Sequence, residues 1–460
     1  MNTIWSPDLS TVRGPKYAAL AASIRGAVRD GSLGEGARLP PVRRLADTIG
    51  VTPGTVARAY AELTGEGVLT AAVGRGTFVA PAERGGPPEP YLAAPADEGE
   101  VNLRTALVPD VGQGPIIAEA LQRSGSDEGW CSYPTAADDL PLAREILGFC
   151  SEGEVGPADP SLVVPTLGAQ HALTIVMQVA LRGTRPRVVV DELAYPGFRH
   201  AAALARAEVS GLPWDEDGPI PDAFEAACRL GGVQLYCTSS EVNNPTTRRT
   251  APARRGEIVA VARRHDVQIL DDDCFMSGAP ESPLYRGLAP ERAWHVGSLS
   301  KRLSPMLRFG YLIAPEGRGR EARLALQHQT FGLPRPVSDT VLELLRSGAA
   351  REIRERVRAA NRSAVALARG VFAGQAFESR DEVPLIWLRM PRGWRASSFA
   401  AAAKTRGVLV RPADLFALPD GRAPNAARIA LNGAVDPAVH ADALGRLAAI
   451  LSETPMDLEI

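Results

Sequence analysis

Residues 81–98 are rich in proline, glycine and alanine and show no apolar period. Such a composition favours a semi-extended linker over a packed element. The 460 residues are also too many for one ordinary core. We therefore expect a small domain over residues 1–80, a linker over 81–98 and a larger domain over 99–460.

Composition narrows the class of protein. No apolar run is long enough to span a bilayer, and the N-terminus lacks a basic-then-apolar signal pattern. We expect a cytoplasmic protein that makes no membrane contact. Its five cysteines are scattered and never spaced as CxxC, so we expect neither a structural zinc site nor a disulfide framework, and no metal.

Positive charge gathers at the N-terminal end. The whole chain carries a net charge of −2, but residues 1–80 hold nine Lys/Arg and six Asp/Glu, a net +3, which leaves −5 for the remainder. A local basic excess favours contact with nucleic acid.

The first eighty residues have the pattern of three short helices and a hairpin. Apolar residues recur at helical spacing over Tyr17–Val28, a second helix is expected between Pro40 and Gly50, and Thr52 can cap a third. Two strand-like runs, Leu69–Val73 and Thr77–Val79, complete a hairpin with a basic tip. This order predicts a winged helix-turn-helix, whose third helix enters the major groove of DNA. A small helical cap with solvated arginines is the alternative.

The same segment resembles the GntR family of regulators over about residues 15–80. The resemblance is carried by GARLP at 36–40, RRLA at 43–46, TVARAY at 55–60 and GRGTFV at 74–79. It implies a double-stranded DNA operator as partner. By this resemblance the DNA contacts are Arg43 or Arg44, Thr52, Thr55, Arg58 and Arg75. Pro53 and Gly54 stand where many relatives have a polar or basic residue.

After the linker, apolar strand-like runs alternate with helical stretches. The runs are Ser161–Val164, Arg187–Val190, Gln234–Cys237 and Val267–Leu270. This alternation predicts an α/β domain with a largely parallel sheet.

Two features in this domain are typical of phosphate and ring-nitrogen recognition. Gly168, Ala169 and Gln170 join a strand to a helix, where backbone N–H groups can approach a phosphate. The carboxylates at 271–273 follow a strand, where one of them could pair with a protonated ring nitrogen. A solvated loop or a metal site is the ordinary alternative for such a run.

Two further features suit the same ligand. Lys301 follows Ser298 and precedes Arg308 by seven residues, a spacing that suits a Schiff base with a phosphate nearby. Asn244 and Tyr195 each lie in a turn after an apolar strand, although Asn-Pro and Tyr-Pro-Gly sequences form turns without any ligand.

Together these motifs resemble, over about residues 99–450, the fold-type-I enzymes of the aspartate aminotransferase class. The resemblance implies pyridoxal 5'-phosphate as cofactor and a smaller C-terminal α+β subdomain at about 335–460. Lys301 and Asp272 take the catalytic roles, as the covalent anchor and the partner of the pyridinium nitrogen. Cofactor contacts are implied for Tyr195, Asn244, Ser298, Arg308, Gly168, Ala169 and Gln170, for Tyr133 across a dimer, and a substrate-carboxylate contact for Arg428.

A winged helix followed by this fold resembles the MocR-type subgroup of GntR regulators. The resemblance implies a homodimer that responds to the cofactor or to a small amino compound. The family's tyrosine after the Asp run is replaced by Cys274-Phe275, its Asn-Pro-Thr-Gly ends in Thr247, and Asp138 stands where a glycine is expected. The regulator is therefore favoured, with an active aminotransferase or a protein that keeps only the fold as alternatives.

Overall fold

The computed structural model describes residues 7, 15–29, 32–34, 36–65, 68–72, 76–79, 99–124, 131–150, 155–275, 278–418, 421 and 423–453. The chain divides into two compact units, Met1–Pro90 and Tyr91–Ile460, and each is described by itself. The division falls inside the proline-rich stretch 81–98. Among the described residues, no helix is both long enough and apolar enough to cross a bilayer.

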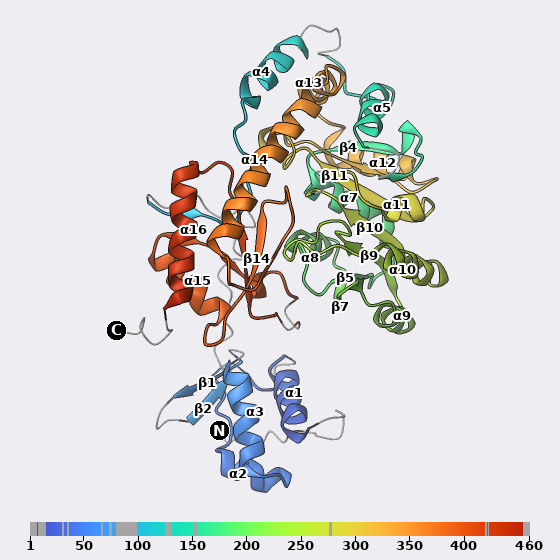
Figure 1. The fold of residues 1–460 in the computed structure, drawn as a ribbon. Helices are drawn as coiled ribbons and strands as arrows, with labels where there is room; N and C mark the ends of the chain where they lie inside the picture. The colour runs from blue at the N-terminus through green and yellow to red at the C-terminus, as the bar shows by residue number, and fades with distance from the viewer. Residues whose placement is uncertain are drawn as a thin grey trace. The chain divides into compact units, whose positions relative to one another are not determined.

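The N-terminal unit has the three helices and the hairpin that the sequence predicts (Figure 1). Gly50 ends the second helix with a φ of 64°, which glycine adopts without steric cost. Thr52 Oγ1 accepts a hydrogen bond from Thr55 N at 3.3 Å and caps the third. The elements are α1 (Lys16–Arg29), α2 (Val42–Ile49), α3 (Pro53–Gly65), β1 (Leu69–Ala72) and β2 (Gly76–Val79).

One pairing in this unit has no signal in the sequence. Arg38 forms a β-bridge with Phe78 of β2. Leu39 N donates to Thr77 O at 2.9 Å, and Val79 N donates to the carbonyl of residue 37 at 2.8 Å. Residues 37–39 therefore lie against the hairpin as a short third strand.

Seven strands form the central sheet of the C-terminal unit. In spatial order they are β4 (Val163–Thr166), β12 (Gly310–Ile313), β11 (Ala293–Ser298), β10 (Gln268–Asp272), β9 (Val233–Thr238), β5 (Arg187–Asp191) and β6 (Glu208–Leu212). Within this sheet β12 is antiparallel to β11 and β4, and the other neighbours are parallel. The sheet is therefore mostly parallel, as predicted.

Alternate residues of the strands fill two cores because successive side chains point to opposite faces. On β5, Val188 and Val190 belong to the core that α7 (Ala169–Ala180) and α8 (Pro196–Leu204) cover. Val189 belongs to the core that α9 (Pro221–Arg229) and α10 (Pro252–Arg264) cover. Burial on both faces explains why these strands read as continuous apolar runs.

A smaller four-stranded sheet lies in the C-terminal part of the same unit. Its order is β13 (Phe377–Ser379), β14 (Leu385–Arg389), β17 (Ala426–Ala430) and β16 (Arg411–Pro412). The helices α14 (Ala349–Val371), α15 (Ala396–Thr405) and α16 (Pro437–Ser452) contribute to its core. β3 (Val101–Asn102) pairs with β15 (Val408–Leu409), so the start of the unit joins this smaller part.

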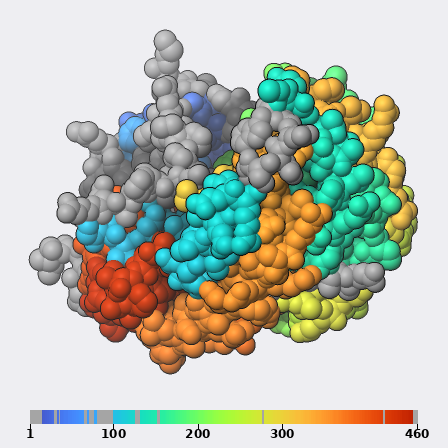
Figure 2. All heavy atoms as spheres, turned by 90° about the horizontal axis from the view of Figure 1, so that it is seen from above, coloured from blue at the N-terminus to red at the C-terminus, as the bar shows by residue number. Residues whose placement is uncertain are grey.

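The smaller subdomain is expected from about residue 335, where α13 (Arg335–Arg346) begins. Val341 and Leu344 of this helix pack in the core that α7 and α8 cover. Figure 2 shows α4 (Gln113–Ser124, cyan) on the surface beside the orange helices that include α13, with which α4 is in contact. The remaining elements are α5 (Leu140–Phe149), α11 (Tyr285–Leu288), α12 (Gly319–Thr330), β7 (Trp214–Asp215), β8 (Gly218–Pro219), η1 (Pro160–Leu162), η2 (Pro305–Leu307) and η3 (Ala413–Leu415).

Candidate functional site

The predicted site residues of the C-terminal unit lie at the carboxyl ends of its parallel strands. Asp272 ends β10 and Ser298 ends β11. Tyr195 and Asn244 follow β5 and β9. Because these four strands are parallel, their ends meet at one edge of the sheet, which is where ligands bind in open α/β folds.

Lys301 carries an amine that is easily deprotonated. Its Nζ donates a hydrogen bond to Ala106 O and lies 5.7 Å from the centroid of the Phe275 ring. Burial lowers the pKa of Lys301 to about 8, with a further lowering by the positive charge of Arg428. A lysine of this pKa is a better nucleophile at neutral pH than an ordinary surface lysine.

The three consecutive carboxylates have three different environments. Asp271 accepts hydrogen bonds from Ser240 N (2.8 Å) and Ser240 Oγ (2.6 Å), so it is engaged in the core. Asp273 Oδ2 lies 3.5 Å from Arg302 Nη2. Asp272 accepts a hydrogen bond from Cys274 N at 3.1 Å, and burial raises the pKa of Asp272 to about 6. A buried carboxylate of this kind is stabilised by a cationic partner such as a protonated ring nitrogen.

Glycines shape the end of the site that faces α7. Gly168, with a φ of 80°, precedes the first residue of this helix. A Cβ on Gly168 would lie 3.1 Å from Arg308 Nη2, and one on Gly310 would lie 2.6 Å from the carbonyl carbon of Gly168. The Arg308 guanidinium therefore lies beside the N-terminal amides of α7, an arrangement that suits a phosphate group. Ser298 Oγ donates to Phe309 O at 3.2 Å and accepts from Ser300 N at 3.1 Å.

Tyr195 is held in place by its neighbours. Its ring lies over Gly197, where a Cβ would come within 2.1 Å of Tyr195 Cε1. Tyr195 OH donates to Gln170 Oε1 at 3.1 Å, and Gln170 Nε2 donates to Gly197 O at 3.2 Å. The sequence assigned Gln170 only through its backbone amide, and its side chain has this additional positioning contact.

Arg428, on β17, reaches the same edge of the central sheet. Its Nη1 donates to Asn244 Oδ1 at 2.8 Å, and its Nη2 donates to Arg104 O. The guanidinium carbon also lies 4.7 Å from the centroid of the Phe416 ring. Sequence reasoning missed Arg104, Phe416 and Ala106 because two of them act through backbone carbonyls and none lies in a motif.

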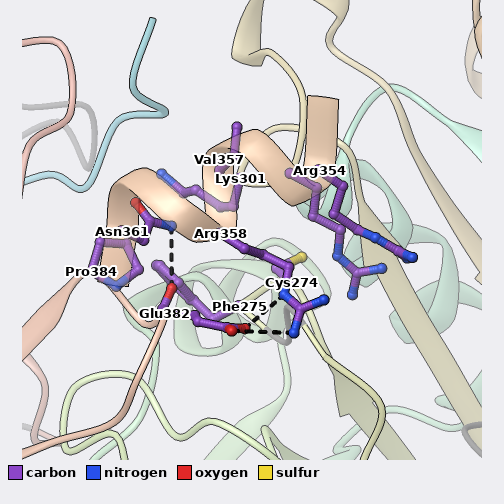
Figure 3. Close-up of a pocket in the computed structure, with 10 residues that line it drawn as sticks. Cys274, Phe275, Lys301, Arg354, Val357, Arg358, Asn361, Glu382 and Pro384 are labelled. Carbon is purple, nitrogen blue, oxygen red and sulfur yellow. Dashed lines mark hydrogen bonds and ion pairs between the residues drawn. The ribbon is translucent and has the colours of Figure 1, made fainter. Parts of the chain in front are cut away.

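A small cavity lies beside Lys301, between α14 and the end of β10 (Figure 3). Its volume of about 10 Å³ is room for one water molecule. Glu382 closes it by pairing with Arg358 Nε at 2.7 Å and by accepting from Asn361 Nδ2 through its carbonyl at 3.1 Å. The cavity is too small for a ligand larger than water.

The predicted DNA-binding residues of the N-terminal unit are on its surface where they are described. Arg43 and Arg44 are exposed on α2. Arg58 is exposed on α3, with its guanidinium carbon 3.9 Å from the centroid of the Tyr17 ring. The hydroxyls of Thr52 and Thr55 are 2.9 Å apart at the start of α3. Arg75 lies outside the described residues.

Comparison with known proteins agrees with this geometry. Residues 107–447 match the family "Aminotransferase class I and II", and residues 16–79 match "Bacterial regulatory proteins, gntR family". The chain belongs to the aminotransferase class I and II family. It carries a gntR-family domain in front of that fold, the combination that is typical of MocR-type regulators.

Similar proteins include regulators over nearly the whole chain. The HTH-type transcriptional regulator TauR of Rhodobacter capsulatus is 29% identical over 474 residues, which cover 92% of this chain and 94% of that protein. The HTH-type pyridoxine biosynthesis transcriptional regulator PdxR of Corynebacterium glutamicum is 29% identical, over 74% of this chain and 75% of its own length.

Solved structures share the fold of the C-terminal unit. LysN, the alpha-aminoadipate aminotransferase of Thermus thermophilus, has a TM-score of 0.68 at 23% identity and covers 77% of this chain and 92% of its own. The kynurenine aminotransferase of Pyrococcus horikoshii has a TM-score of 0.68 at 20% identity and covers 79% of this chain and 92% of its own.

The departures from the aminotransferase pattern have structural counterparts. The Phe275 ring faces Lys301 Nζ at 5.7 Å, and Cys274 lines the same small cavity beside Lys301. Thr247 stands where the pattern expects a glycine, and its φ of 63° lies in the left-handed region that favours glycine. Asp138 Oδ2 accepts hydrogen bonds from the N and Oγ1 of Thr135, both at 2.7 Å, and stabilises its turn by side-chain contacts.

Proposed function

We propose that this protein is a transcriptional regulator that binds DNA through its N-terminal unit and pyridoxal phosphate through Lys301. The observation that carries the proposal is the presence, in one chain with a gntR-family domain, of a lysine with a pKa of about 8 beside the Asn244–Arg428 pair. The relatives include an HTH-type pyridoxine biosynthesis transcriptional regulator, which supports the same proposal.

The donor set of this site fits pyridoxal phosphate. Gly168 lets the Arg308 guanidinium approach the backbone, since a Cβ there would lie 3.1 Å from Nη2, and Gly310 lets β12 approach the backbone at the start of α7. Asp272 is a buried carboxylate with a raised pKa, which a cationic ring nitrogen would stabilise. When bound, the cofactor supplies an aldehyde that condenses with amines and a ring that withdraws electrons.

Each residue then has one task. Lys301 provides the amine for covalent attachment, and Asp272 holds the proton on the ring nitrogen. Tyr195 packs on the ring, and Asn244 donates to the ring hydroxyl. The phosphate is bound by Ser298, Arg308 and the backbone of Gly168, Ala169 and Gln170.

Arg428 gives the regulator a way to recognise an effector. Its planar guanidinium suits a carboxylate. We infer that the effector is a small amino compound, and that one with a carboxylate beside the amine binds Arg428 while its amine meets the cofactor. Phe275 brings no hydroxyl to the site, which favours capture of an amine over full turnover.

The proposal includes a homodimer. Tyr133 is 76% exposed and Phe331 is 66% exposed, and their rings are 5.3 Å apart. Met306, two residues before Arg308, is 89% exposed. Exposed large apolar side chains next to a phosphate site favour burial by a second copy, with Tyr133 reaching the partner's phosphate. Sedimentation of the full chain should give the mass of a dimer, and Tyr133→Ala should weaken cofactor retention.

The decisive experiment uses the small number of lysines. The chain contains three, Lys16, Lys301 and Lys404. Protein mixed with pyridoxal phosphate should gain a visible band, and borohydride should fix the cofactor onto the peptide that contains Lys301. Lys301→Ala should lose this adduct, and Lys404→Ala, a change at an exposed lysine, should keep it. An unchanged adduct in Lys301→Ala would contradict the assignment.

The DNA half is tested separately. The full chain should retain a duplex from the region upstream of its own gene, with a footprint of two half-sites for a dimer. Variants of Arg43, Arg44, Arg58 and Arg75 should weaken this binding. Equal binding after deletion of residues 1–80 would contradict the proposal, and rapid turnover of common amino donors would favour the aminotransferase instead.

A further inference from the structure

Arg38 lies on the outer face of the β1–β2 hairpin, which is the wing of the predicted winged helix-turn-helix. Val79 of β2 is 2% exposed and packs in the core. Because side chains alternate along a strand, Phe78 and the Gly76 position both lie on the opposite face. The guanidinium carbon of Arg38 is 6.0 Å from the centroid of the Phe78 ring. A Cβ on Gly76 would lie 3.1 Å from Arg38 Nε, so the guanidinium covers a position that has no side chain.

The backbone of Arg38 is fixed as well. The β-bridge with Phe78 and the hydrogen bond from Leu39 N to Thr77 O hold residues 37–39 on the hairpin. The side chain therefore begins from a rigid strand and lies on an aromatic ring. This arrangement reduces the conformational entropy that a long side chain loses when it binds a partner.

The guanidinium has no acceptor in the described part of the chain. Arg38 is exposed and makes no hydrogen bond or ion pair with any described residue. Arg25 of the same unit differs, because it pairs with Glu62 at 2.9 Å. Arg38 thus presents N–H donors in a planar fork, the geometry that matches a phosphate group.

We propose that Arg38 is a further contact to the DNA backbone, held in place by Phe78 and Gly76; this inference rests on the DNA-binding function proposed above. The contact is to phosphate rather than to a base, because wings lie along the backbone or in the minor groove and most protein–DNA hydrogen bonds go to phosphate and sugar. The net +3 charge of residues 1–80 favours an anionic partner.

The test measures salt dependence with the full chain. The probe is a fluorescent 30-base-pair duplex of mixed sequence, and anisotropy gives the affinity between about 50 and 300 mM KCl. Each phosphate contact contributes about 0.9 to the slope of log affinity against log salt concentration. For each wing engaged, Arg38→Gln should therefore reduce the slope by about 0.9 and weaken binding about eightfold at 0.1 M salt, which is about 1.8 and about 60-fold for a dimer with both wings bound.

Conservative variants separate the charge from its support. Arg38→Lys and Phe78→Leu keep a cation at residue 38 but lose the stacked guanidinium, so each should keep the slope and weaken binding by a few fold. The matched control is Arg248→Gln in the C-terminal unit, which also removes a guanidinium held over a ring, 5.9 Å from the Trp214 centroid. It should change neither slope nor affinity.

The outcomes are distinct. If the wild type binds the duplex and Arg38→Gln keeps its slope and its thermal melting, the inference is overturned. An unchanged slope with an altered oligomer mass would assign the guanidinium to a protein partner and also overturn it. If the wild type binds no duplex at all, the DNA-binding function fails and this inference fails with it.

Discussion

Arg428 and Asn244 join the two parts of the C-terminal unit through a hydrogen bond of 2.8 Å between Nη1 and Oδ1. Arg428 belongs to the smaller sheet, and Asn244 follows a strand of the central sheet. Both side chains are buried. A carboxylate bound by Arg428, as proposed, would therefore compete with the Asn244 amide oxygen and act on a contact between the two parts.

Arg428→Met should remove the preference for amines that carry a carboxylate. Charge-assisted hydrogen bonds contribute roughly 1.5–3 kcal/mol, which is about 10- to 150-fold in affinity. We expect that loss for an amino acid and almost none for the amine formed by its decarboxylation, both measured by the change in the visible band. The decarboxylated amine is the control, because it lacks only the carboxylate that Arg428 would bind. Equal losses for the two ligands would show that Arg428 does not bind the carboxylate.

The capture of pyridoxal phosphate should depend on pH through Lys301. The pKa of Lys301 is lowered to about 8, mainly by burial. Because the neutral amine is the nucleophile, the rate of band formation should rise as the pH increases and level off above about 8. An unperturbed lysine would continue to gain rate toward its ordinary pKa near 10.4. Rapid mixing between pH 6.5 and 9.5 measures this, and a rate that still rises tenfold per pH unit above 9 would contradict the lowered pKa.

Two fully buried arginines should respond to substitution in opposite ways. In the described part of the chain Arg286 has no hydrogen-bond partner for its Nε, Nη1 or Nη2, and its residue exposure is 0%. Arg255 is equally buried but pairs with Glu241 at 2.7 Å and donates to Pro283 O at 3.1 Å. Replacing a buried guanidinium that has no hydrogen-bond partner by an apolar side chain removes its desolvation cost, whereas breaking a buried pair leaves the partner uncompensated.

Arg286→Met should therefore raise the free energy of unfolding by about 1–3 kcal/mol, and Arg255→Met should lower it by about 3–5 kcal/mol. Urea unfolding of the two variants side by side measures the difference. If both variants lose stability to the same extent, Arg286 has a partner that compensates its charge.

The sequence predicted the architecture because its signals were local. Pro53 after a capping Thr52 marks the start of α3, and strands such as β5 are apolar throughout because both faces are buried. The positions of Lys301 and Asp272 followed from motifs at strand ends. The contacts to Ala106 O and Arg104 O could not be predicted, because a backbone carbonyl carries no sequence signal.

Long-range packing also could not be predicted from the sequence. The stacking of Arg38 on Phe78 and of Arg428 on Phe416 joins residues that no local period relates. The roles of the three adjacent carboxylates can be distinguished only from their partners, and Ser240 and Arg302 come from other segments of the chain.

Thr247 stores strain that glycine would release. Its φ of 63° lies in the left-handed region, which is costly for a β-branched residue. Thr247→Gly should stabilise the folded chain by about 1 kcal/mol, and Thr246→Gly, at the neighbouring position, should destabilise it because Thr246 Oγ1 donates to Asn243 Oδ1 at 2.8 Å. Thermal melting compares the two. A lower melting temperature for Thr247→Gly would mean that its side-chain contacts outweigh the strain.

Phe275 stands at the position of a tyrosine in the aminotransferases that this chain resembles. The O–H of that tyrosine donates to the ring oxygen of the cofactor. Phe275 faces Lys301 at 5.7 Å without such a donor, and the cavity beside it has room for one oxygen atom. Phe275→Tyr should therefore place a donor in the site without a steric clash.

The cofactor-loaded wild type should change its visible band at a higher pH than Phe275→Tyr does. A hydrogen bond to a charged group is worth roughly 1.5–3 kcal/mol, and each 1.36 kcal/mol is about one pH unit. The pH midpoint of the band change should thus fall by about one to two pH units in Phe275→Tyr. It should not fall in Phe275→Leu, which adds no donor. Turnover with amino donors should rise in Phe275→Tyr. If the midpoint stays where it was, Asn244 alone stabilises the ring oxygen, and the absent hydroxyl does not explain why this chain favours sensing over catalysis.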